Sequence, residues 1–129
     1  MPKFGKQSER VLITCHIDLQ RVAREVIKGS DFSVVSGHRT PAEQADLVRR
    51  GLSLTATRSK HLADPSEAMD LAPYPIDWRD QDRFLHLAGR VLQAGAYLGV
   101  RLRWGGDWDS DGDLRDQNFM DLGHFELAK

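Results

Sequence analysis

Residues 59–71 read SKHLADPSEAMDL: one histidine, a turn-rich middle and an apolar end. Pro65 lies among turn-forming residues, and the apolar run that follows predicts a strand over residues 68–74. His61 is therefore expected on a loop and Asp70 on a strand. A lone histidine and a lone aspartate indicate little, so their meaning depends on what the rest of the chain supplies.

Helices and strands surround this segment in a mixed order. Helical spacing of apolar residues predicts helices over residues 18–29, 40–51 and 80–99. Runs rich in β-branched and aromatic residues predict further strands over residues 31–39, 100–104 and 123–128. There is no regular βαβ alternation, so we expect an α+β fold in which helices pack around a small antiparallel sheet.

The ends and buried faces of two helices are specified more closely. Asp18 is the expected N-cap of the first helix, and Thr40 and Glu43 form an expected capping box at the start of the second. The apolar positions expected to face the core are Leu19, Val22, Ala23, Val26 and Ile27 in the first helix and Phe84, Leu87, Ala88, Val91 and Leu92 in the third.

Composition limits the class of protein. The chain has 129 residues, 40% hydrophobic and 29% charged, which predicts one globular domain over residues 1–129. A net charge of −1 gives no electrostatic reason to expect nucleic acid as a partner. Cys15 is the only cysteine, so no disulfide within the chain is expected. No apolar run approaches the ~20 residues of a membrane helix, and the charged start does not resemble a signal peptide. We expect a monomer that does not insert into membranes.

A metal site is one interpretation of the scattered polar residues. A catalytic zinc ion takes three protein ligands from His, Asp, Glu or Cys and leaves one position open. His61 and Asp70 supply two such side chains, and His124 in the terminal segment DLGHFEL supplies a third. Asp121 is then a candidate general base, and Arg39 a candidate for holding a carbonyl oxygen as charge develops on it. The spacing equally allows solvent-exposed, ion-paired or packed side chains with no catalytic role.

Four segments in order, SGHRTPAEQ, SKH…AMDLAP, RWGGDW and DLGHFEL, resemble the zinc peptidases that include D-Ala-D-Ala carboxypeptidases and phage L-alanyl-D-glutamate endopeptidases. The phage endolysin branch is the more similar, over about residues 30–127. The resemblance implies zinc bound at the sheet by His61, Asp70 and His124. It implies that Asp121 is the catalytic acid and base, that Arg39 polarises the substrate, and that Gln44 binds substrate beside the cleft.

The chain departs from the family pattern between the first two implied ligands. His61 and Asp70 are two residues further apart than usual, and Ser66 and Glu67 stand where a glycine is expected. A loop enlargement explains this difference, because loop length changes cost little free energy. We therefore expect both ligands to be retained.

The resemblance implies hydrolysis of stem peptides of peptidoglycan, as in a phage endolysin. Such a protein is expected to remain in the host cytoplasm until a membrane pore admits it to the cell wall or periplasm. Two other interpretations remain: a bacterial D,D- or L,D-carboxypeptidase with the same zinc site, and a non-catalytic module that binds peptidoglycan.

A second metal site is suggested by the acidic segment over residues 107–118. Asp107, Asp109 and Asp111 alternate and are followed by Gly112, as at the opening of a calcium loop, and Asp113 adds another carboxylate. Position 12 is Asn118 instead of the bidentate glutamate of an EF-hand. A solvated acidic turn explains the segment equally well. If calcium binds there, it is expected to order the chain that leads to Asp121.

Overall fold

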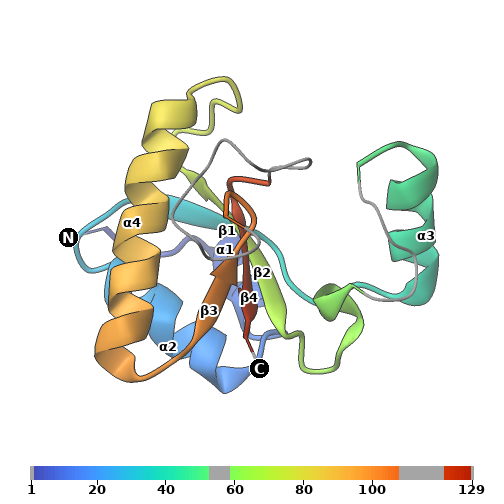
Figure 1. Ribbon diagram of the computed structural model, residues 1–129, viewed down its shortest axis with the longest axis horizontal. Coiled ribbons are helices and arrows are strands. Elements are labelled where there is room, and N and C mark those ends of the chain that lie inside the picture. The colour runs from blue at the N-terminus through green and yellow to red at the C-terminus, as the bar shows by residue number, and fades with distance from the viewer. Residues whose placement is uncertain (1, 53–58, 108–120, 129) are drawn as a thin grey trace.

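The computed structural model describes residues 2–52, 59–107 and 121–128. Its helices are α1 (Lys6–Leu12), α2 (Ile17–Val26), α3 (Pro41–Arg49), α4 (Gln81–Leu98) and the 3-10 turn η1 (Lys60–Leu62). Its strands are β1 (Phe32–Ser36), β2 (Ala68–Pro73), β3 (Leu102–Trp104) and β4 (His124–Leu127). The strands form one antiparallel sheet in the order β1-β2-β4-β3 (Figure 1). The predicted α+β fold with a small antiparallel sheet is confirmed.

Helices cover the sheet unevenly. α4 packs on β2 and β3, α2 packs on α4, and α1 lies beside β1. α3 stands apart, on the other side of the sheet from α4 (Figure 1). The expected core positions of the first and third predicted helices are buried, except Leu92, which is partly buried. One hydrophobic cluster contains these residues, apart from Phe84, together with the sheet residues Leu71 and Phe125, and Leu92 packs against it.

Strand pairing brings distant segments together at one point of the sheet. Asp70 in β2 lies opposite Ser36 of β1 on one side and opposite His124 of β4 on the other. The pairing of β1 with β2 is irregular between Val34 and Ser36. Side chains alternate between the two faces of a strand, so Asp70 points away from the face that Met69 and Leu71 give to the core.

The helix ends test the capping predictions. The capping box at Thr40 and Glu43 is present, with Thr40 Oγ1 accepting the backbone N–H of Glu43 at 3.2 Å. Asp18 is not the N-cap of α2, because the Nδ1 atom of His16 accepts the backbone N–H of Asp18 at 3.0 Å. Asp18 instead lies in the first turn, where its negative charge favours the helix dipole.

Two further observations complete the fold. The short, polar helix α1 was not expected from the sequence; its Ser8 side chain accepts the backbone N–H of Val34 at 3.0 Å and so ties α1 to β1. None of the helices in the described residues has the length and apolar character needed to cross a membrane.

Candidate metal centre

His61, Asp70 and His124 come from η1, β2 and the first residue of β4, and they meet on the side of β2 opposite to Met69 and Leu71. One potential ligand atom from each lies within 4.8 Å of the other two. The Nε2 atom of His61 is 3.3 Å from Asp70 Oδ2, and the Nδ1 atom of His124 is 3.0 Å from Asp70 Oδ1. Both histidines are buried. Three segments that are far apart in the sequence therefore form one compact donor set.

Hydrogen bonds orient both imidazole rings. The Nδ1 atom of His61 is 2.7 Å from the carbonyl oxygen of Gly37, and this contact requires Nδ1 to carry the proton. The Nε2 atom of His124 is 2.9 Å from Glu126 Oε1, and it likewise donates to that carboxylate. The other two ring nitrogens, His61 Nε2 and His124 Nδ1, lie 3.3 Å apart beside the Asp70 carboxylate. Two imidazole nitrogens and one carboxylate converging in this way fit a divalent cation.

The electrostatics of the centre also favour a cation. Burial alone would raise the pKa of Asp70, but hydrogen bonds from His124 and His61 hold it well below its usual range. Burial opposes a charge on His124, yet hydrogen bonds to Asp70 and Glu126 raise its pKa to about 9. Without a metal, a proton on His124 thus balances the two carboxylates. A metal that binds there replaces this proton, because a ligating imidazole nitrogen must be deprotonated.

Arg39 lies directly against the donor set. Its Nη2 atom donates to Asp70 Oδ2 at 2.6 Å, Nε donates to Ser36 Oγ at 3.1 Å, and Nη1 donates to Gln44 Oε1 at 3.0 Å. A guanidinium carries five N–H groups, and these described partners use three of them. Arg39 therefore fixes the orientation of Asp70, and no residue in the described part of the chain accepts from its other two N–H groups.

Gln44 contacts Arg39 from a buried position. Its side chain is fully buried, and its Oε1 atom accepts the hydrogen bond from Arg39. A side chain with no exposed surface does not reach a substrate in this conformation. The effect of Gln44 on substrate is therefore expected to act through Arg39 and not through direct contact, which differs from the role implied by the family resemblance.

Asp121 lies just before β4, held by its main chain. Its N–H donates to the carbonyl oxygen of Gly105 at 2.9 Å, and its carbonyl oxygen accepts the N–H of His124 at 3.1 Å. A Cβ atom on Gly105 would lie 2.2 Å from the carbonyl oxygen of Asp121, so only glycine permits this approach. Burial, and then repulsion from Asp70, raise the pKa of the Asp121 carboxyl. A carboxylate with a raised pKa is better suited to accept a proton.

Glu126 and Lys60 belong to the centre but were not singled out from the sequence. Glu126 Oε1 accepts from His124, and Lys60 Nζ lies 3.3 Å from Glu126 Oε2. Lys60 also donates to the carbonyl oxygen of Leu127. The two-residue spacing of His124 and Glu126 could have indicated the pair, because alternate residues of a strand share a face. The contact links the segment that carries His61 to the strand that carries His124.

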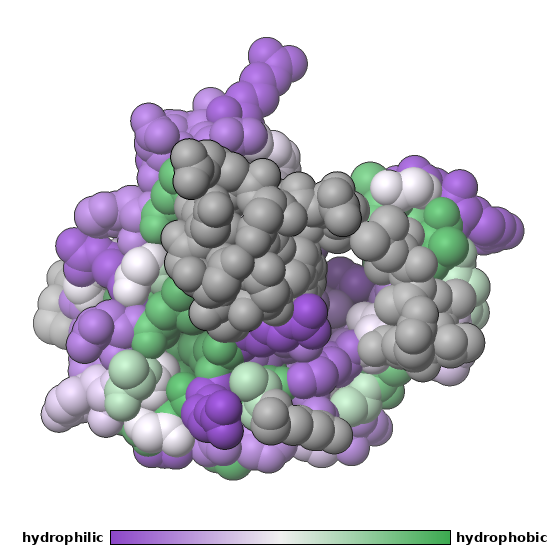
Figure 2. All heavy atoms as spheres, viewed as in Figure 1, coloured by the Kyte–Doolittle hydropathy of each residue, from purple (hydrophilic) through white to green (hydrophobic). Residues whose placement is uncertain are grey.

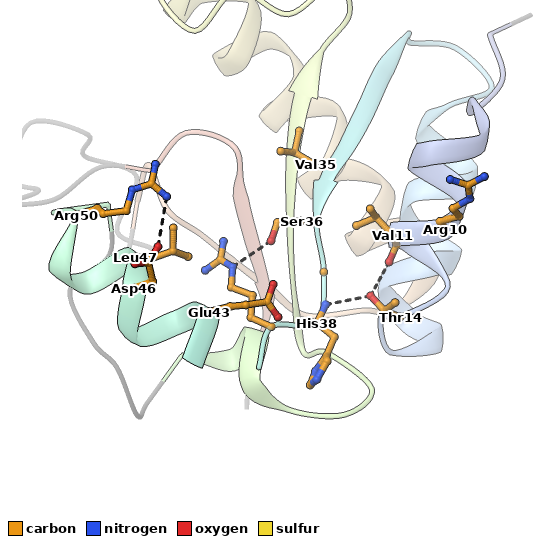
Figure 3. Close-up of a pocket in the computed structure, with 12 residues that line it drawn as sticks. Arg10, Val11, Thr14, Val35, Ser36, His38, Glu43, Asp46, Leu47 and Arg50 are labelled. Atoms are coloured by element: carbon orange, nitrogen blue, oxygen red, sulfur yellow. Dashed lines mark hydrogen bonds and ion pairs between the residues drawn. The ribbon is translucent and has the colours of Figure 1, made fainter. Parts of the chain in front are cut away.

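A charged pocket adjoins the centre on the β1 side. It has a volume of about 440 Å³ and lies between α1, β1 and α3, with Ser36 and Arg39 among its lining residues. Figure 3 shows Glu43 and Leu47 of α3 facing Val11 of α1 and Thr14, just after α1, across it. In the space-filling view, mainly hydrophilic side chains line the recess between α3 and the rest of the molecule (Figure 2). Charged groups thus surround the approach to Arg39.

Of the residues proposed for calcium, only Asp107 is described. It is partly buried, and its N–H donates to the carbonyl oxygen of Trp104 at 3.1 Å. Asp109, Asp111 and Asp113 lie outside the described residues. The calcium hypothesis therefore stays a prediction.

Replacing Glu126 with glutamine is expected to weaken binding of a divalent metal about 10–100-fold, the usual cost of losing a partner that orients a ligating histidine. The amide is a poorer acceptor for the His124 N–H and no longer pairs with Lys60. Zinc affinity would be measured by competition with a chromophoric chelator at constant pH. Glu67→Gln is the matched control, because the described contacts of Glu67 with Lys60 and Leu127 use its main chain. Equal affinities for the wild type and Glu126→Gln proteins would contradict this role.

The donor set, together with a neighbouring acid, is the arrangement of a metal-dependent hydrolase. Comparisons with known proteins agree with this class. A family model described as phage L-alanyl-D-glutamate peptidase matches residues 1–128. The chain belongs to that family and is an enzyme.

Individual relatives cover nearly the whole chain. The L-alanyl-D-glutamate peptidase of Escherichia phage T5 is 41% identical over 134 residues, and the match covers 98% of both chains. The crystal structure of the Serratia marcescens L-Ala D-Glu endopeptidase ChiX is similar, with a TM-score of 0.78 and 32% identity. That match covers 98% of this chain and 90% of the other.

Proposed function

We propose that this protein is a zinc-dependent endopeptidase that cleaves the bond between L-alanine and D-glutamate in the stem peptides of peptidoglycan, and that it acts as a phage endolysin. The observation that carries the proposal is the convergence of His61, Asp70 and His124, with both rings oriented by hydrogen bonds. Membership of the peptidase family and the names of the two relatives support the choice of bond.

Zinc is the metal that we propose for this donor set. Two imidazoles and one carboxylate also bind non-haem iron(II) in oxygenases, so the ligands alone do not select the metal. Hydrolysis requires no change of oxidation state, and zinc is a metal without redox chemistry. Membership of a peptidase family therefore supports zinc. We propose that it would be bound by His61 Nε2, an Asp70 oxygen and His124 Nδ1. Bound zinc supplies a Lewis acid and lowers the pKa of a coordinated water molecule toward ~7.

The chain's own residues supply the remaining chemistry. Asp121 accepts a proton from the attacking water and returns it to the leaving amine nitrogen, which needs a proton before the bond can break. The raised pKa of Asp121 suits both transfers. The two N–H groups of Arg39 that do not donate to Ser36, Gln44 or Asp70 hold the carbonyl oxygen of the scissile bond as negative charge develops on it. Gln44 and Ser36 keep Arg39 in position through the hydrogen bonds that they accept.

Product analysis tests the proposed bond. Purified peptidoglycan would be incubated with the zinc-loaded protein, and the products identified by mass spectrometry. Free L-alanine carboxyl ends and free D-glutamate amino ends are the expected new termini. Release of a single terminal D-alanine would instead favour the carboxypeptidase alternative, and binding without cleavage would favour the non-catalytic module. Atomic emission on the same preparation is expected to find one zinc per chain.

The wider setting follows from the same proposal. We propose a single catalytic domain over residues 1–129, supported by the one hydrophobic cluster that joins the described helices to the sheet. The enzyme is proposed to act as a monomer, to be made in the host cytoplasm, and to reach the cell wall through a membrane pore. Expression with and without a pore-forming protein tests the last point, since lysis is expected only with the pore.

Calcium is proposed as a second, regulatory ion at Asp107, Asp109, Asp111 and Asp113, supported by their alternate spacing. The double substitution Asp109→Ala with Asp111→Ala is expected to abolish any increase in activity caused by added calcium. Hydrolysis rates of zinc-loaded wild type and variant would be compared with calcium and with a calcium-selective chelator. An unchanged response in the variant would remove calcium from the proposal.

A further inference from the structure

An aromatic pocket lies at the entry to β4, next to the metal centre, whereas the charged pocket lies on the β1 side. It has a volume of about 270 Å³ and is lined by Trp78, Gln81, Phe84, Asp121, Leu122 and Gly123. Asp121 is shared between this pocket and the metal centre. In the order β1-β2-β4-β3, the charged pocket lies on the β1 side of Asp70, whereas this pocket lies where the chain enters β4. A substrate bound at the metal therefore meets different chemistry in its two directions.

Trp78 is an exposed aromatic side chain on a fixed support. It is 63% exposed, although its ring stacks on the buried ring of Phe84 with centroids 5.6 Å apart and planes at 26°. Tyr74 and Ile76, in the same turn, are also exposed. Exposed apolar side chains grouped beside an active site usually mark a binding surface. One face of the indole is therefore packed, and much of the side chain remains accessible to a ligand.

Hydrogen bonds hold the segment that carries Trp78. The Arg83 side chain donates to the carbonyl oxygen of Pro75 at 2.7 Å, and the N–H of Arg79 donates to Asp77 Oδ1 at 3.0 Å. The N–H of Asp80 donates to the carbonyl oxygen of Asp77 at 3.1 Å. The aromatic surface is thus formed before a ligand arrives, which lowers the entropy cost of binding.

The substrate of the proposed function has matching asymmetry. In peptidoglycan, the L-alanine nitrogen is joined to the lactyl group of an N-acetylated amino sugar, whereas the peptide beyond D-glutamate carries carboxylates. One lactyl unit and one alanine separate the sugar ring from the scissile bond, a reach of about 7 Å when extended. The sugar must therefore lie close to the metal centre. The charged pocket suits the acidic peptide, and the aromatic pocket suits a sugar ring.

We propose that the pocket of Trp78, Gln81 and Asp121 is a subsite for the amino sugar that carries the stem peptide. This inference rests on the proposed function. The C–H groups of a pyranose ring carry partial positive charge, so they pack favourably on the negative face of the indole. Gln81 is the first residue of α4, and its side-chain amide offers a donor and an acceptor to the acetamido group of the sugar. The enzyme is then expected to cleave stem peptides attached to the amino sugar with a higher kcat/KM than the free peptides.

Two matched substrates test the subsite: an N-acetylmuramyl stem peptide, and the same peptide carrying only the lactyl group. We expect the wild type to cleave both and to prefer the sugar-bearing one. Trp78→Ala is expected to lower kcat/KM for the sugar-bearing substrate about tenfold, with little change for the lactyl peptide. Tyr97→Ala is the control, because Tyr97 is an aromatic residue 77% exposed on α4 that does not line this pocket.

Trp78→Phe guards against misfolding of the alanine variant, since it keeps an aromatic ring on Phe84 and should give a smaller loss of the same kind. Equal losses on both substrates, or no loss on either, would overturn the sugar subsite while leaving the peptidase activity intact. Equal losses would indicate that Trp78 binds the peptide instead. Failure of the wild type to cleave either substrate would overturn the proposed function itself, so the two failures are distinguishable.

Discussion

Replacing Asp70 with alanine is expected to remove the bound metal and to lower hydrolysis by about 10³-fold or more, because a catalytic metal supplies several kcal/mol of barrier reduction. Three interactions are lost together. Asp70 provides a ligand oxygen, accepts a hydrogen bond from Arg39 at 2.6 Å, and lies 3.0 Å from His124 Nδ1. Without the carboxylate, only the two imidazole donors remain, and the positive charge of the neighbouring Arg39 guanidinium, no longer paired with Asp70, disfavours a cation at the site.

The measurement is zinc content by atomic emission and kcat/KM on the lactyl stem peptide, with circular dichroism to check that the variant folds. Asp18→Ala is the matched control, since Asp18 also pairs with an arginine, Arg21, but lies on α2 and lines neither pocket beside the metal centre. It should keep its zinc and its activity. A folded Asp70→Ala protein with one zinc per chain would rule out Asp70 as a ligand.

Replacing Asp121 with asparagine should separate metal binding from catalysis. Asparagine has nearly the same shape, and the contacts that position residue 121 are made by its main chain with Gly105 and His124. The variant is therefore expected to keep one zinc per chain. Its amide does not accept a proton, so kcat should fall about 10²–10⁴-fold, the usual contribution of a general acid or base.

Single-turnover rates, zinc content and substrate affinity would be measured on the same Asp121→Asn preparation. Asp107→Asn is an informative comparison, because it makes the same chemical change in a neighbouring aspartate that is not proposed to transfer protons. Activity within a fewfold of wild type in Asp121→Asn would assign the proton transfer to another group. Loss of zinc would mean that Asp121 supports the ligands directly.

The sequence was informative where local patterns determine structure. Capping at Thr40 and the apolar faces of α2 and α4 follow from short-range rules, and the structure agrees with them. The N-cap of α2 was wrongly placed at Asp18, because a histidine nitrogen at His16 performs the same function as a carboxylate oxygen. α1 was not predicted because its residues are mostly polar and its support comes from a distant strand.

The donor set required more than spacing. His61 and His124 are 63 residues apart; the pairing of β2 with β4 sets His124 opposite Asp70, and the 3-10 turn η1 brings His61 to the same point. Spacing alone left an ordinary structural interpretation open, and only the ordered family motifs favoured these residues together. The contact of Glu126 with His124 could have been predicted, because residues two apart in a strand point to the same face. The burial of Gln44 and the close approach of Gly105 to Asp121 depend on tertiary packing, which local patterns do not encode.

The three hydrogen bonds of Arg39 have a thermodynamic consequence. They join β1 through Ser36, α3 through Gln44 and the donor set through Asp70. We therefore expect the position of α3 and the occupancy of the metal centre to be coupled, because a displacement of Arg39 affects both, and coupling between two sites is reciprocal. A ligand that binds between α1 and α3 and favours this position of α3 strengthens metal binding, and the metal strengthens that ligand's binding by the same factor. Substrate affinity and metal retention are then expected to rise and fall together.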